Sequence, residues 1–257
     1  MLNAGIRFFD IDLCFEHDNS YGPGLWTCHS GAFGGPMTKF FDQIDRWMNE
    51  QKNRNEIIVL QFNRDYEKGE EKNIGTALMK ELKSRWNPSN ENIRNKKLSM
   101  QTYLHETIGQ AVKTNQRIYT FVHYRLREKL YDPFLLWEHY IGYTWQQMGY
   151  VGSNECKKLS DAVSNKCGQQ GEHQKFVRLD LTLTWGLCND DMAYKCNQLI
   201  ADATNKCYAN IKKQAGNKRF KISTVNFIVV DYAHRYPGVN AVKIAKEMTL
   251  KYIAAQQ

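Results

Sequence analysis

The sequence has no stretch that approaches the roughly 20 apolar residues of a membrane-spanning helix, and no signal peptide stands at Met1. Repeats, low-complexity tracts and linker-like segments are also absent. Apolar residues make up 42% of the chain and charged residues 24%, which is an ordinary globular composition. We therefore expect a single folded domain over residues 1–257.

No two of the seven cysteines form a C-x-x-C pair, so the sequence does not indicate a structural zinc site. Disulfides in an oxidising compartment are the favoured interpretation, although their pairing cannot be deduced from the sequence. The odd count leaves one free thiol, or a thiol whose partner precedes this chain. No N-glycosylation sequon supports secretion. Five cysteines fall in one third of the chain: Cys156, Cys167, Cys188, Cys196 and Cys207.

The formal net charge of +8 suits a protein that meets anionic phosphates or an anionic membrane surface. The charge would suit nucleic acid equally well, but no nucleic-acid-binding motif accompanies it, so nucleic acid is not an expected partner. Lysine and arginine are dispersed along the chain, as in Lys96–Lys97 and Lys218–Arg219, and most such pairs are solvated.

Apolar patterning predicts strands that alternate with helices, which is typical of α/β proteins. A helix of period 3.6 fits 36–52, where Pro36 suits the first turn. A continuous apolar run at 56–63 reads as a parallel strand that is buried on both faces. The predicted strands lie near 6–15, 25–29, 56–63, 117–124, 134–145, 178–185 and 225–232. The predicted helices cover 36–52, 74–86, 104–113, 190–213 and 239–254.

The first forty residues hold the densest group of candidate functional side chains. In the run GIRFFDIDLCF, the period of two places Asp10 and Asp12 on one face of a strand. Two adjacent carboxylates on so apolar a strand are costly without a positive charge between them. A second short strand, LWTCH, ends at His29 beside a turn of small residues. The pattern indicates a site for a divalent metal and for acid/base chemistry.

Four pieces resemble the X domain of phosphatidylinositol-specific phospholipase C-like phosphodiesterases, closest to the secreted single-domain forms of fungi and other lower eukaryotes. They are GIRFFDID, the CH strand end, the Gly-Gly-Pro helix start and EIIVLQFN, in the family's order between Gly5 and Asn63. The resemblance returns at VNFIVVDY, which is similar to the family's last barrel strand. It implies a TIM-type (β/α)8 barrel, and 257 residues is near the ~250 of that fold.

The resemblance also implies that the family's first strand is missing here. Seven strands are predicted, whereas a closed barrel of this class has about eight. In the family the first strand carries a histidine, followed by Asn or Asp, that acts as general base. Its absence puts the activity of the chain in doubt, and the missing segment and a signal peptide would both precede Met1. The expected localisation is secreted or extracytoplasmic.

By resemblance, Asp10 and Asp12 match the acidic pair that binds calcium in the metal-dependent members of the family. Metal-independent bacterial members carry an arginine at the position of Asp12, so an aspartate there favours a metal. Asn63 falls where the family places another oxygen ligand, often a glutamate, although it would alternatively do no more than cap the strand. Hard oxygen ligands favour Ca²⁺, which we expect in preference to Mg²⁺.

The remaining assignments also follow from the resemblance. His29 matches the general acid that protonates the leaving oxygen, and Asp231 matches the carboxylate that orients the missing histidine. For substrate contact, the expected residues are His123, Arg125, Asp180, Trp185 and Tyr232.

The implied function is hydrolysis of a phosphodiester in a phosphatidylinositol-like phospholipid, with contact to an anionic membrane. Two alternatives remain open. In the first alternative, the chain is a catalytically inactive barrel that binds phospholipid or a partner. In the second, it is an enzyme similar to glycerophosphodiesterases and sphingomyelinase D. The latter usually carry a Glu-x-Asp pair and a His-Gly strand end, whereas this chain has Asp10–Asp12 and His29–Ser30.

Overall fold

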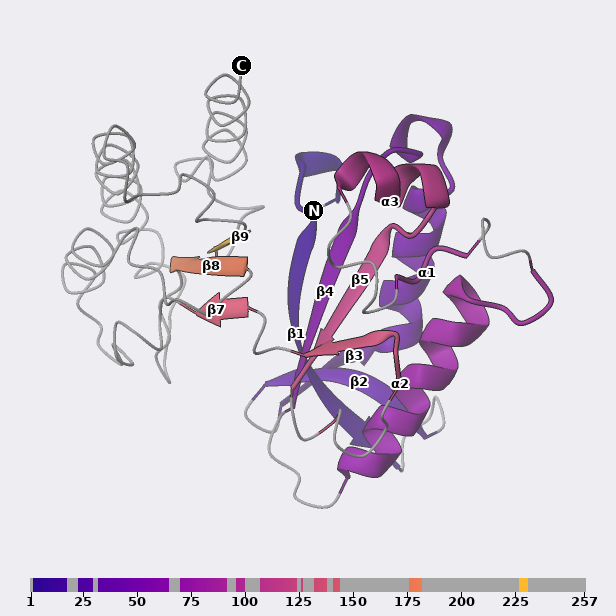
Figure 1. Ribbon diagram of the computed structural model, residues 1–257. Helices are drawn as coiled ribbons and strands as arrows, with labels where there is room; N and C mark the ends of the chain where they lie inside the picture. Colours follow the sequence, from indigo (N-terminus) through magenta and orange to yellow (C-terminus); the bar gives the residue numbers. More distant parts are fainter. Residues whose placement is uncertain are drawn as a thin grey trace. The chain divides into compact units, whose positions relative to one another are not determined.

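The computed structural model describes residues 2–17, 23–29, 32–64, 70–91, 96–99, 107–123, 126, 132–137, 141–143, 176–181 and 227–230. The chain divides into two compact units (Figure 1). The first takes in Leu2 and Arg7–Glu138, and the second takes in Met1, Asn3–Ile6 and His139–Gln257. We describe each unit by itself.

The first unit contains a six-stranded sheet of order β3-β2-β1-β4-β5-β6. Strands β1, β4, β5 and β6 run parallel to one another, whereas β2 is antiparallel to both of its neighbours. The parallel strands therefore end at one common edge of the sheet. The bounds are β1 Phe8–Glu16, β2 Gly24–His29, β3 Ala32–Pro36, β4 Ile58–Arg64, β5 Ile118–Val122 and β6 Leu135–Trp137.

The helices of this unit are short, and two of them cover one face of the sheet. Helix α1 spans Met37–Met48 and α2 spans Glu71–Trp86, and in Figure 1 both lie beside β1, β4 and β5. Helix α3 spans Ile108–Thr114 and begins with a capping box at Thr107. Two short 3₁₀ turns span Leu2–Ala4 and Gln51–Asn53.

The hydrophobic core lies between these two helices and the sheet. Phe41 of α1 packs edge-on against Phe62 of β4, with ring centroids 6.3 Å apart, and against Trp86 of α2 at 5.3 Å. Leu13 and Leu60 are also completely buried. Because side chains alternate along a strand, the residues next to Leu13 in β1 and next to Leu60 in β4 leave the sheet on its opposite face. That face carries the polar residues of the site.

Ionic contacts join the two helices at their solvent side. Arg85 of α2 donates hydrogen bonds to Asp42 and Asp45 of α1 and to Glu81 one turn earlier. Burial alone would lower the pKa of Arg85, but hydrogen bonds to these three carboxylates outweigh it and raise the pKa above its usual value. The indole N–H of Trp86 also donates to Asp45.

A buried arginine supports the opposite, N-terminal ends of the strands. The guanidinium of Arg117 donates to the carbonyls of Asn53 and Glu56 and to the side chain of Asn115. Burial lowers its pKa below the ordinary arginine value.

The second unit is described over three strands, which form a parallel sheet of order β7-β8-β9. Their bounds are β7 Ile141–Tyr143, β8 Phe176–Leu181 and β9 Phe227–Val230. The strands predicted near 178–185 and 225–232 are found here as β8 and β9. The helices predicted at 190–213 and 239–254 lie outside the described residues.

The prediction of an α/β protein is confirmed, but a closed barrel stays a prediction, because the described strands form two open sheets. Two details of the sequence interpretation were wrong. The predicted strand at 134–145 is two short strands, β6 and β7, which belong to different sheets. The small-residue turn before α1 contains a strand, β3, and Pro36 precedes the first helical residue. No described helix is long and apolar enough to span a membrane.

Candidate functional site

The predicted metal-binding residues lie on two adjacent parallel strands, toward the carboxyl end of β4. Asp10 and Asp12 lie on β1, and Asn63 lies near the end of the adjacent β4. The register pairs Asp12 with Asn63 and Asp10 with Gln61. Since paired residues of parallel strands leave the sheet on the same face, all four side chains share one face. This is the face opposite to the one that packs on α1 and α2.

Direct hydrogen bonds connect these side chains. The Asn63 amide nitrogen donates to Oδ1 of Asp10 at 2.6 Å, and its amide oxygen accepts from Nε2 of Gln61 at 3.2 Å. Asp10 is exposed, Asp12 and Asn63 are half-buried, and Gln61 is buried. This cluster of polar side chains therefore extends from the buried Gln61 to the solvent-exposed Asp10.

The antiparallel pairing of β2 brings His29 back toward this acidic segment. The register pairs Leu13 with Thr27, and His29 follows Thr27 by two residues in the direction that runs back along β1 toward Asp12. A parallel second strand would have ended at a similar edge but would have needed a long crossover. The sequence predicted His29 at a strand end but not this direction.

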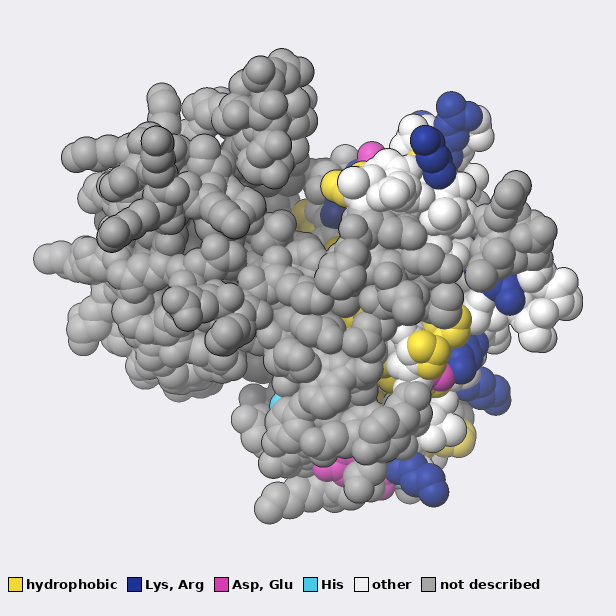
Figure 2. All heavy atoms as spheres, viewed as in Figure 1, with side chains coloured by type: hydrophobic (Ala, Val, Ile, Leu, Met, Phe, Trp, Pro, Cys, Tyr) yellow, Lys and Arg dark blue, Asp and Glu magenta, His cyan; other side chains and the backbone are white. Residues whose placement is uncertain are grey.

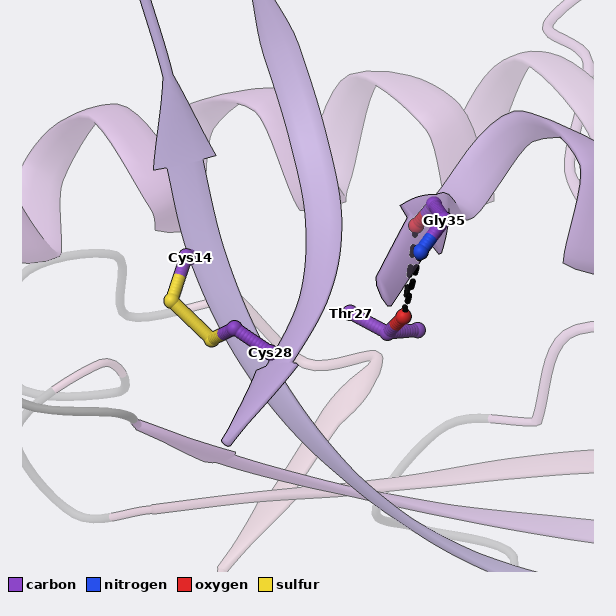
Figure 3. The surroundings of a disulfide bond; sticks show 4 residues. All are labelled: Cys14, Thr27, Cys28 and Gly35. Atoms are coloured by element: carbon purple, nitrogen blue, oxygen red, sulfur yellow. Dashed lines mark hydrogen bonds between the residues drawn. A yellow bond between two sulfur atoms is a disulfide. The ribbon is translucent and has the colours of Figure 1, made fainter. Parts of the chain in front are cut away.

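A disulfide holds the two strands together next to the site (Figure 3). Cys14 of β1 and Cys28 of β2 are bonded, and both residues are buried. Cys28 directly precedes His29, and Cys14 lies two residues after Asp12 on the same face of β1. The cross-link therefore limits how far the backbone at His29 can separate from the acidic pair. It supports the prediction that this chain uses disulfides.

The Gly-Gly-Pro segment closes against β2 through Thr27. Figure 3 shows the Thr27 hydroxyl facing Gly35, whose N–H donates to it at 3.0 Å. Gly34 approaches Thr27 so closely that a Cβ on Gly34 would overlap the threonine hydroxyl. Glycine is therefore required at this position for steric reasons rather than for backbone flexibility.

The predicted substrate-contacting residues have different outcomes. His123 follows β5, is half-buried, and donates its backbone N–H to the carbonyl of Phe62 at 3.0 Å. It therefore lies on the same edge as Asn63, one strand further along. Asp180 lies on β8 of the second unit, in register with Val229. The residues Arg125, Trp185, Asp231 and Tyr232 lie outside the described residues.

The side chains at this edge fit a hard cation by their chemistry. Asp10 and Asp12 offer carboxylate oxygens on one face of one strand, which are the donors that Ca²⁺ and Mg²⁺ prefer. Over the residues that the structure describes, no group of three or more His, Cys, Asp or Glu side chains could hold a metal ion. Other oxygens, from amides, water or a substrate phosphate, would have to complete the coordination.

Sequence reasoning missed Gln61, which the structure places at the buried end of the cluster of polar side chains. The run EIIVLQFN was interpreted as a uniformly apolar strand. The signal was present, because a polar residue two positions before Asn63 must share its face.

On the face that Figure 2 draws, the basic side chains of the described residues do not gather around one point. Figure 2 shows Lys and Arg at several separate places along the outer edge of the first unit. This agrees with the dispersed lysines and arginines of the sequence, and any attraction to an anionic surface would be spread over the molecule.

Comparison with known proteins gives a likeness of structure without one of sequence. No protein-family model matches this chain, and no curated protein matches its sequence. A single-site mutant of the phosphatidylinositol-specific phospholipase C from Staphylococcus aureus superposes with a TM-score of 0.51 at 16% identity, covering 94% of this chain and 79% of that one. A structure from work on membrane binding of the same enzyme gives 0.50 at 16% identity, covering 94% and 80%. The predicted resemblance is thus confirmed at the level of the fold: this chain has a phosphatidylinositol-specific phospholipase C-like fold.

Proposed function

We propose that this chain is a phosphoric diester hydrolase of the phospholipase C type, acting on phosphatidylinositol-like headgroups. One observation carries the proposal. In a phospholipase C-like fold, Asp12 pairs with Asn63 near the carboxyl end of β4, Asp10 lies two residues earlier on the same face, and His123 directly follows the adjacent parallel strand β5. Functional groups of α/β folds gather at that edge of the sheet.

A divalent cation, with Ca²⁺ preferred over Mg²⁺, would be held by the carboxylates of Asp10 and Asp12. When bound, such an ion supplies positive charge that stabilises a phosphorane-like transition state. Asn63 was predicted to add an oxygen, but its amide nitrogen is the atom that faces Asp10. Its oxygen accepts one hydrogen bond from Gln61, and the second lone pair of that oxygen is the one with which it would ligate a cation.

The histidine at the end of β2 is proposed to carry the proton. A hydroxyl of the headgroup gives up its proton to a general base and attacks phosphorus, the bond to the lipid oxygen breaks, and His29 donates a proton to that oxygen, which leaves a cyclic phosphodiester on the headgroup. Histidine suits this role because its ordinary pKa lies near physiological pH. The proposed role of Asp231 is to orient a histidine base. The resemblance places that base in the family's first strand.

The test is hydrolysis of phosphatidylinositol in mixed vesicles, with Ca²⁺ and with a chelator. We expect release of inositol phosphate that requires the ion. Release of choline from phosphatidylcholine or sphingomyelin instead would favour the glycerophosphodiesterase or sphingomyelinase D alternative. Retained Ca²⁺ binding without any hydrolysis would contradict the proposal and favour a phospholipid-binding module.

Substitution of one carboxylate should weaken cation binding and hydrolysis together. Asp12→Asn removes one of the two negative charges at the site, and we expect Ca²⁺ affinity to fall at least about tenfold because each hard-oxygen ligand contributes strongly. Calorimetric Ca²⁺ titration and the hydrolysis assay measure both effects. The control is Glu91→Gln, which removes the same charge from an exposed bend far along the sequence. Equal losses of Ca²⁺ affinity in both variants would show that the effect comes from the net charge of the protein and not from a lost ligand.

A further inference from the structure

The hydrogen bonds around Gln61 point to a function for a residue outside the predicted site. Gln61 is only 1% exposed, in a strand whose neighbouring residues are apolar. A buried side-chain amide is costly unless it is hydrogen-bonded, so such a residue in a core strand needs a structural reason. Its Nε2 donates to Oδ1 of Asn63, and Nδ2 of Asn63 donates to Oδ1 of Asp10.

The chemistry of the three groups fixes the direction of these bonds. An ionised carboxylate can only accept hydrogen bonds, so the atom of Asn63 that lies 2.6 Å from Asp10 has to be its nitrogen. The Asn63 oxygen then faces Gln61 and needs a donor, which Nε2 of Gln61 supplies. If Asn63 turned over, its oxygen would oppose the Asp10 carboxylate and its nitrogen would oppose the Gln61 nitrogen. Both contacts would be lost.

The hydrogen-bonded series Gln61–Asn63–Asp10 is called the relay below. Burial makes Gln61 its fixed end. Asn63 is half-buried and Asp10 is exposed, so both could exchange protein contacts for water. Gln61 is enclosed within the sheet, and its amide cannot reach bulk water without a shift of the strand. Gln61 therefore holds, from the interior of the sheet, the orientation of Asn63 that the Asp10 carboxylate requires.

We propose that Gln61 is a positioning residue that holds Asn63 as a hydrogen-bond donor to Asp10, and that Asn63 thereby orients a cation-binding carboxylate instead of ligating the cation itself. The inference rests on the proposed function, since it assumes that Asp10 binds a cation. Hydrogen bonds to a ligating carboxylate fix its orientation, and losing them costs metal affinity even though no ligand is removed.

The first experiment replaces the donor without opening a cavity. Gln61→Met keeps the length of the side chain and removes the N–H group. We expect Ca²⁺ affinity, measured by calorimetry on the full chain, to fall by about 10- to 100-fold. The Asn63 side-chain amide resonances in a ¹⁵N–¹H spectrum should also shift, and this readout does not depend on turnover. Unchanged affinity together with unchanged Asn63 resonances would overturn the proposal.

The matched control is Thr120→Val on the adjacent strand. Thr120 is completely buried, and its hydroxyl donates to the carbonyl of Phe134. Thr120 pairs with Leu60, on the face that packs against the helices, so it has no part in the relay. The control should lower thermal stability without changing Ca²⁺ affinity. An equal loss of affinity in both variants would show a general effect of removing a buried polar group, and would overturn the proposal.

A second variant covers the case in which Gln61→Met does not fold. Asn63 is half-buried near the end of its strand, where packing is less demanding. Asn63→Ala should therefore fold and should cause the same loss of Ca²⁺ affinity. Where both fold, Gln61→Met in the Asn63→Ala background should change affinity by no more than about twofold, because Gln61 acts through Asn63. Fully additive losses would overturn the relay.

The outcomes separate this inference from the proposed function. A parent chain that binds Ca²⁺ but hydrolyses nothing, with affinity lost in Gln61→Met, supports the relay and contradicts the hydrolase. Hydrolysis by the parent chain, together with unchanged Ca²⁺ affinity in Gln61→Met, supports the hydrolase and contradicts the relay. A parent chain that does not bind Ca²⁺ overturns the positioning role, and the hydrolysis assay then decides the function alone.

Discussion

His29 is the single residue on which the proposed proton transfer depends. It ends β2 and directly follows a cysteine whose disulfide partner lies two residues after Asp12. Its backbone position is thus fixed by a ladder of hydrogen bonds on one side and by a covalent bond on the other. This arrangement favours a histidine that must return to the same place in each catalytic cycle.

Replacement of this histidine should separate turnover from cation binding. His29→Ala removes the proton donor but leaves both aspartates, so we expect the rate of hydrolysis to fall about 10²- to 10⁴-fold. Calcium affinity should stay within about twofold of the parent, because no carboxylate ligand is changed. The control is His17→Ala, an exposed histidine 3.4 Å from Glu70. A His29→Ala chain as active as the parent would refute the general-acid assignment.

At the scale of elements, the antiparallel pair β2 and β3 connects the site to the helical layer. The strand order places this pair at the edge of the sheet, next to β1. The disulfide joins two cysteines that are 14 positions apart, Cys14 and Cys28, and closing a loop of that length stabilises a fold by about 3 kcal/mol in the chain-entropy treatment. The loop joins the acidic strand to the strand that carries His29.

The close approach of Gly34 to Thr27 gives a test of this element. Gly34→Ala would place a methyl group against the Thr27 hydroxyl, and we expect about 1–3 kcal/mol of destabilisation from overpacking. Urea unfolding of the full chain measures the change in the free energy of unfolding. Gly35→Ala is the control from the same motif, because its Cβ would have nothing within 4 Å. Adding Thr27→Ala should recover part of the loss in Gly34→Ala, and no recovery would show that the overlap is not the cause.

At the scale of the whole molecule, the charge of +8 is the property that bears on a membrane partner. Figure 2 shows that the basic side chains of the described part of this face are separated rather than clustered. Attraction to an anionic surface would therefore be long-range and screened by salt, not confined to one headgroup site.

This distribution predicts salt-sensitive binding to anionic membranes. Sedimentation with phosphatidylglycerol vesicles should capture the chain at low salt, and capture should fall sharply at about 0.5 M salt, where the screening length is only a few ångströms. Neutral phosphatidylcholine vesicles are the control and should capture much less. Equal capture by both vesicles at all salt concentrations would indicate an apolar contact instead of an electrostatic one.

The sequence alone determined most of the strands and helices of the first unit, but not β3 or the bounds of β6. Strong apolar periodicity predicted β1, β4, α1 and α2 to within a few residues, because burial of one face requires that spacing. It also identified Asp10 and Asp12, which lie within β1, and Asn63, which lies near the end of β4, as candidate metal-binding residues. A period of two was enough to place the two aspartates on one face.

Only the tertiary structure decided which of these residues meet. The pairing of Asp12 with Asn63, the return of His29 by an antiparallel strand and the bond between Cys14 and Cys28 all join residues from different strands. A one-dimensional pattern reports the environment of each residue but not its partner, because register and direction are set by the packing of the whole sheet. In the sequence, Gln61 looks like an irregularity in an apolar strand. Its proposed role follows only from the hydrogen bond that it donates to Asn63 and from the one that Asn63 donates to Asp10.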